Sequence, residues 1–150
     1  MEFAFYQILS LAAQKKDILL TMTSVQYIGK ERSETELITS GTLEKTADGV
    51  IVSYEESEAT GFEGSKTTVT CKGNDIVDIR RQGANNSTLI IEPGTKHHCH
   101  YGTPFGDFTV GIYAHKIENS LDEDGGRLYL KYTVDINSSY ISDNEIFLTI

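Results

Sequence analysis

From residue 17 to the end of the chain, apolar and polar residues alternate over many short runs. In the clearest run, residues 127–136, an apolar side chain occupies every even position. A period of two places these side chains on one face of a strand and their neighbours on the other. Similar runs occur near residues 18–27, 35–44, 49–56, 66–72, 75–81, 87–92, 97–101, 107–117 and 144–150. The pattern predicts about ten strands, most with one buried face.

Tight turns separate these runs and fix how the strands connect. Turn signals include Asp48-Gly49, Gly73-Asn74, Pro93-Gly94 and Asp124-Gly125-Gly126. Connections this short leave no room for crossover helices, so neighbouring strands must be antiparallel, in either a sandwich or an up-and-down barrel. We favour the barrel, because closure removes two long unpaired edges. The predicted fold is all-β: a closed antiparallel up-and-down barrel of about 8–10 strands spanning residues 17–150.

Residues 1–16 differ from the rest of the chain and form a predicted N-terminal helical extension. Phe5, Ile8, Leu9 and Ala12 recur at spacings of three and four, which is the period of an amphipathic helix. A secretory signal would begin with Lys or Arg before its apolar segment, but here the residue at that place is Glu2. We expect one short helix that packs over a barrel end or flank, or that contacts a partner.

Charge and cysteine content narrow the partners and the compartment. With 13 Lys and Arg against 22 Asp and Glu, the formal net charge is -9. The resulting field repels phosphate backbones and anionic lipid surfaces, so we expect neither nucleic acid nor a membrane as partner. Cys71 and Cys99 form no spacing motif and are too few for a disulfide framework. We expect a cytoplasmic protein with both thiols reduced.

Two charged residues fall on the predicted inner face. By alternation, Glu56 shares a face with Val52, and Arg81 shares a face with Ile79. A carboxylate and a guanidinium inside a barrel are costly unless they pair with each other or with a ligand. Pairing is our hypothesis, and bidentate geometry would suit it. The alternative is that a bulge lets one or both charges leave through the rim.

Other inward polar residues could orient a ligand beside this pair. Tyr54 precedes Glu56 on the same face, and Tyr101 and Thr103 share a face of a later run. Together with Glu56 and Arg81 they are our candidate ligand-binding residues in an otherwise apolar interior. Arg81, taken by itself, suits an acidic head group.

Histidines 97, 98 and 100 resemble a metal cluster but lack the ligands to complete one. On a strand, His98 and His100 share a face, and only His115 or a carboxylate could add a third ligand. We therefore expect solvated histidines, no metal and no cofactor. The sequence also lacks a nucleophile motif or a phosphate-cradling glycine loop, which favours a protein that is not an enzyme.

An ordered series of short motifs resembles the YwiB-like bacterial family, a domain of unknown function. The motifs are Leu37-x-Thr39-x-Gly41-x-Leu43, Tyr54-x-Glu56, Thr60-Gly61, Glu63-Gly64, Val77-x-Ile79-x-Arg81-x-Gly83, Tyr101-x-Thr103-Pro104-x-Gly106 and Leu130-x-Tyr132. The resemblance covers roughly residues 17–150 and implies a calycin-like, lipocalin-like barrel. It brings no catalytic residue with it.

Two functions remain open at this level. The first is a small-molecule binder that holds an amphipathic or acidic ligand in the barrel. The alternative is a protein-interaction or structural module, as a homodimer for example, with a filled interior and no ligand.

Overall fold

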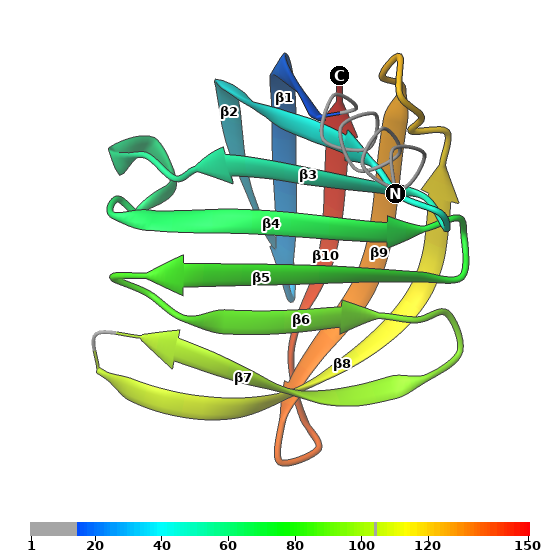
Figure 1. Cartoon of the computed structure of the whole chain (residues 1–150). Helices are drawn as coiled ribbons and strands as arrows, with labels where there is room; N and C mark the ends of the chain where they lie inside the picture. The colour runs from blue at the N-terminus through cyan, green and yellow to red at the C-terminus, as the bar shows by residue number, and fades with distance from the viewer. Residues whose placement is uncertain (1–14, 104) are drawn as a thin grey trace, which may run out of the picture.

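The computed structural model describes residues 15–103 and 105–150, which form a closed barrel of ten antiparallel strands (Figure 1). Each strand pairs with its sequence neighbours, and β1 closes the barrel against β10. The elements are β1 (Lys15–Ile28), β2 (Glu31–Lys45), β3 (Val50–Glu55), η1 (Glu58–Thr60), β4 (Ser65–Lys72), β5 (Ile76–Gly83), β6 (Ser87–Ile91), β7 (Lys96–Thr103), β8 (Gly106–Asn119), β9 (Arg127–Ile136) and β10 (Ser139–Thr149). This confirms the all-β, up-and-down barrel predicted from alternation.

The N-terminal helix predicted over residues 1–16 falls almost wholly outside the described residues. Its last two residues are an exception, because Lys15 and Lys16 already belong to β1 and pair with β2. The barrel therefore begins two residues earlier than predicted. Within residues 15–103 and 105–150 the only helical element is the short 3-10 turn η1, and no helix there is long and apolar enough to cross a membrane.

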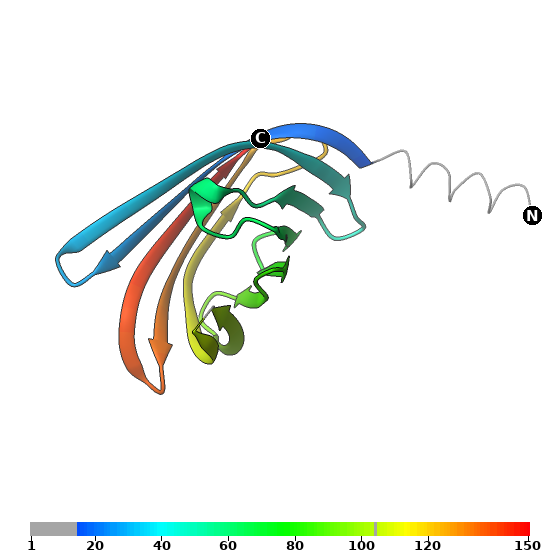
Figure 2. The same cartoon turned by 90° about the vertical axis from the view of Figure 1, so that its left-hand side faces the viewer.

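Antiparallel pairing gives the barrel two distinct ends. The hairpins β1–β2, β3–β4, β5–β6, β7–β8 and β9–β10 all lie at one end. In Figure 2, η1 stands in front at this end, and the β1–β2 and β9–β10 hairpins extend to the left and lower left. The four connections from even to odd strands lie at the other end. We call the end with the five hairpins the open end, and the opposite end the filled end.

The filled end is packed by its own side chains. Fully buried aliphatic residues from strands all around the wall meet there: Leu20, Leu43, Val52, Val69, Val77, Leu130 and Leu148. Removing this apolar surface from water is the main stabilising contribution to the fold. Cys71 lies in the same cluster, and burial raises the pKa of its thiol to about 12. Its side chain acts as a small apolar core group.

A β-bulge and a glycine at a close approach of two strands allow the apolar side chains to keep facing the barrel interior. A bulge in β8 between Ala114 and Lys116 lets both Ala114 and Ile117 face inward. At Gly41, where β2 first pairs with β3, an added Cβ would overlap the carbonyl oxygen of Ser53. Glycine is therefore required for this close approach. Residues 31–40 of β2 pair with β1 but not with β3, so this half of β2 stands beside the open end.

Candidate functional site

The open half of the barrel contains a cavity of about 510 Å³. Its walls are mainly aliphatic and aromatic, and all ten strands contribute side chains to them. The lining includes Ile79, Leu89, Val110, Ile112 and Val134. This volume falls within the range of pockets that hold drug-sized molecules. The interior is thus neither wholly filled nor wholly open.

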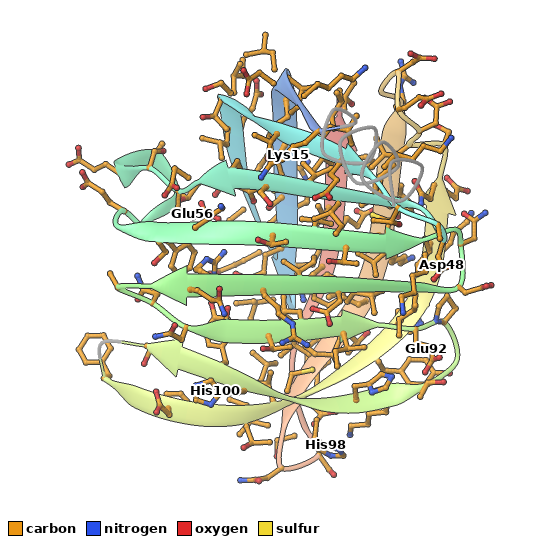
Figure 3. The ribbon with its side chains drawn as sticks, viewed as in Figure 1. Lys15, Asp48, Glu56, Glu92, His98 and His100 are labelled. Carbon is orange, nitrogen blue, oxygen red and sulfur yellow. The ribbon has the colours of Figure 1, made fainter. Side chains whose placement is uncertain are left out.

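Four of the five candidate residues line this cavity: Tyr54, Arg81, Tyr101 and Thr103. The fifth, Glu56, lies directly behind Arg81, just past the end of β3. In Figure 3, Glu56 lies at the left beside the β3–β4 hairpin, which is the open end. The Thr103 hydroxyl donates to the carbonyl oxygen of Gly106 at 2.8 Å, so it holds the β7–β8 hairpin.

Glu56 is held at the open end by three donors. Its carboxylate accepts hydrogen bonds from Thr67 Oγ1 at 2.6 Å and from Thr60 Oγ1 at 2.7 Å. Arg81 Nη2 lies 3.5 Å from Glu56 Oε1, and the Glu56 side chain is only 1% exposed. The two charges therefore meet inside the barrel, through one contact and not in the bidentate geometry. Neither charge leaves through the rim.

Arg81 is positioned by an aromatic ring on one face of its guanidinium and by polar groups at its edges. Phe62 stacks on it, with the guanidinium carbon 3.6 Å from the ring centroid, and Nη1 lies 3.5 Å from Ser87 Oγ. Its Nε is buried and has no hydrogen-bond partner among the described residues. A buried donor without an acceptor is costly, so the guanidinium has hydrogen-bonding capacity that Glu56 and Ser87 do not use.

Two buried tyrosines complete the polar region. Burial raises the pKa of Tyr132, and the nearby Tyr101 raises it further while Arg81 opposes this effect. Burial also raises the pKa of Tyr54, whose hydroxyl donates to Met22 Sδ at 3.2 Å. Both phenols are neutral at physiological pH, so each offers a hydrogen-bonding group without a charge.

The sequence of the β3–β4 hairpin explains why the Glu56 carboxylate lies beside Arg81. Thr60, four residues after Glu56, lies in η1 and caps the carboxylate, while Gly61 ends this turn with φ of +82°. Gly83, at the end of β5, has φ of +124°, and a Cβ there would crowd the carbonyl oxygen of Gly64. Only glycine adopts these conformations readily.

The histidines lie apart from this site. His98 and His100 are exposed and point away from the barrel (Figure 3), and His97 Nε2 lies 3.0 Å from Glu92 Oε1. His115 contacts Thr133 instead, at 2.7 Å. Within residues 15–103 and 105–150, no group of three or more His, Cys, Asp or Glu is arranged to hold a metal.

Sequence reasoning missed four residues of the polar region: Thr60, Phe62, Thr67 and Tyr132. Alternation places Thr67 and Tyr132 on inner faces, so the period-two pattern alone could have identified them. Thr60 and Phe62 belong to a connection, where no period applies. Their role depends on the path of the hairpin over Arg81.

Comparisons with known proteins place the chain in a family. The model of a domain of unknown function, DUF1934, matches residues 20–148. The chain belongs to the DUF1934 family. The fold is similar to that in the crystal structure of the ywiB protein from Bacillus subtilis, which is 22% identical, with a TM-score of 0.71 over 91% of this chain and 92% of that one. Searching curated proteins finds no significant match.

These findings confirm the YwiB-like resemblance drawn from the motifs. At this level of identity the solved structure shows the shared fold alone. In this DUF1934 protein, the motif residues Glu56, Thr60, Arg81 and Gly83 converge on one corner of the open end.

Proposed function

We propose that this DUF1934 protein binds a small amphipathic molecule in the open half of its barrel. The observation that carries the proposal is the cavity of about 510 Å³, because it combines apolar walls with one polar region around Arg81. Ligand pockets typically have this composition: most of the lining is apolar, and a few placed polar groups set orientation.

Three further inferences belong with this proposal. A barrel with one packed end and one open end is consistent with the calycin-like, lipocalin-like grouping. The acidic composition and the two buried free cysteines support a cytoplasmic bacterial protein. Nothing in the polar region calls for catalysis, and we propose a binding protein that uses neither metal nor organic cofactor.

Titration with Nile red, an uncharged dye whose fluorescence rises in apolar surroundings, tests binding in the cavity. Leu89 lines the cavity, and its replacement Leu89→Trp should fill part of the volume and weaken dye binding by about tenfold or more. Thr88→Trp adds the same bulk on the outer face of the same strand and should leave binding unchanged. Equal binding by all three proteins would refute the proposal.

A homodimer is the second candidate function. Leu19 is 68% exposed and Ile38 is 62% exposed, both on the outer face of the β1–β2 hairpin. Two copies that met through this face would cover both side chains. Sedimentation velocity of the wild type and of Ile38→Lys tests it: the dimer hypothesis expects a concentration-dependent dimer that the substitution removes. A wild-type monomer at tens of micromolar contradicts it.

A further inference from the structure

We infer that the polar group of the ligand is an uncharged hydrogen-bond acceptor, such as an amide or ester carbonyl or a hydroxyl oxygen, that rests against Arg81. This inference rests on the proposed function and specifies the class of ligand. It differs from the expectation drawn from Arg81 alone, which favoured an acidic head group. The difference comes from the charges and hydrogen bonds around that arginine.

The cavity has few charged residues near it. Of the described residues that line it, only Arg81 and Glu145 carry charges. Arg81 already faces the buried carboxylate of Glu56 at 3.5 Å. The Glu145 carboxylate is directed to the outer face, where Tyr27 and Tyr129 donate to it, so the interior carries one positive and one negative charge, Arg81 and Glu56. An anionic head group would compete with Glu56 for Arg81 and would leave one buried carboxylate without a counterion, which is costly.

A cationic head group is disfavoured for a different reason. Both oxygens of Glu56 already accept hydrogen bonds from threonines. Glu145 accepts from Tyr27 at 3.1 Å and from Tyr129 at 2.5 Å. A cation beside Glu56 would lie close to Arg81, a like charge, and the hydroxyls that hold Glu145 lie on the outer face of the barrel.

The unsatisfied group in the polar region is a donor. Arg81 Nε is buried with no partner among residues 15–103 and 105–150, and Nη1 reaches Ser87 only at 3.5 Å. A neutral oxygen in the cavity can accept from the edge of the guanidinium that Ser87 holds only at 3.5 Å, and it leaves the Glu56–Arg81 pair intact. Tyr132 lines the same cavity and offers a second, uncharged donor.

The apolar part of such a ligand has a defined place. Ile79 lies two residues before Arg81 on the same face of β5, and Val110 and Ile112 extend the apolar wall on β8. A chain attached to the neutral head group would run from Arg81 along these side chains, away from the open end and into the apolar interior. The ligand class is a neutral amphiphile.

Displacement of Nile red by decanamide, decanol, decanoate and decylammonium tests this inference, because these compounds share a chain and differ in the head group. For the wild type, decanamide and decanol should displace the dye at concentrations about tenfold lower than decanoate and decylammonium. Glu56→Gln removes the competing carboxylate. In this variant the concentration of decanoate needed to displace the dye, relative to that of decanamide, should therefore fall by about tenfold. Asp78→Asn removes a negative charge from the outer face of β5 and should leave the order unchanged.

The outcomes separate the inference from the proposed function. If wild-type protein binds Nile red, if Leu89→Trp weakens that binding and if decanoate displaces the dye as well as decanamide or better, the ligand class is wrong while the proposed function stands. Failure of all four compounds to displace bound dye also contradicts the ligand class. If Leu89→Trp has no effect on the dye, the proposed function itself fails. The wild-type order tests the inference even if Glu56→Gln does not fold.

Discussion

Removing Arg81 should destabilise the barrel more than removing its partner Glu56. The Glu56 side chain is 1% exposed, whereas that of Arg81 is 17% exposed. Arg81→Met leaves a buried carboxylate with only two threonine hydroxyls, and breaking a buried pair in this way costs about 3–5 kcal/mol. We expect the lower end of this range, because the bonds from Thr60 and Thr67 are short.

Glu56→Gln should cost less, about 1–3 kcal/mol, since the amide keeps the shape and some of the hydrogen bonds while Arg81 retains access to water and its stacking on Phe62. The double variant should be more stable than the sum of the two losses predicts. The coupling should be about 1–2 kcal/mol, because the charges are buried but meet through a single contact at 3.5 Å.

Urea unfolding followed by far-ultraviolet circular dichroism measures these values for the wild type, both single variants and the double variant. The pair Asp78 and Arg80 on the same strand is the control. It is closer, at 3.1 Å, but the two side chains are 27% and 58% exposed. Its cycle should give a coupling below about 1 kcal/mol. If the Glu56 and Arg81 losses add within about 0.5 kcal/mol, the two residues do not act as a pair and our reasoning is wrong.

Three further predictions concern the core, the phenols and the backbone. The buried Cys71 thiol should resist Ellman's reagent in the folded protein and react fully in urea; fast reaction without denaturant would contradict the described packing. Burial raises the pKa of Tyr132, so above about pH 10 the unfolded chain loses a proton that the folded protein retains, and stability falls as pH rises. Tyr132→Phe should reduce that slope, measured by urea unfolding, by about 1.4 kcal/mol per pH unit, and an unchanged slope would show that the phenol ionises freely. Gly83→Val, which places a branched side chain at φ of +124° and crowds Gly64, should cost about 1–3 kcal/mol in the same assay, whereas a neutral effect would mean that the β5–β6 hairpin has another conformation.

Alternation predicted which face each strand buries, because a period of two depends only on local sequence. It therefore found the ten strands and placed Glu56 and Arg81 on inner faces. Alternation does not predict where a residue lies along the barrel axis, because that position depends on the register between strands. That is why Thr67, opposite Arg81 in the β4–β5 ladder, was not recognised as a donor to Glu56.

The connections were harder to predict for a different physical reason. The β3–β4 hairpin has no repeating pattern, and its path is set by Gly61 and by the bond from Thr60 to Glu56. Only the folded chain brings Phe62 onto the guanidinium of Arg81. The sequence left an acidic ligand open beside an amphipathic one, because it showed the arginine without the hydrogen bonds that hold Glu56 beside it.

The amphipathic ligand is the central claim of this account, and native mass spectrometry of the protein purified from its own host without denaturation tests it most directly. The wild type should carry a bound species of defined mass that is released on unfolding, and Leu89→Trp, with its cavity partly filled, should lose it. Mass spectra of the bare chain for both proteins, or the same adduct on both, would contradict a ligand in the open half of the barrel.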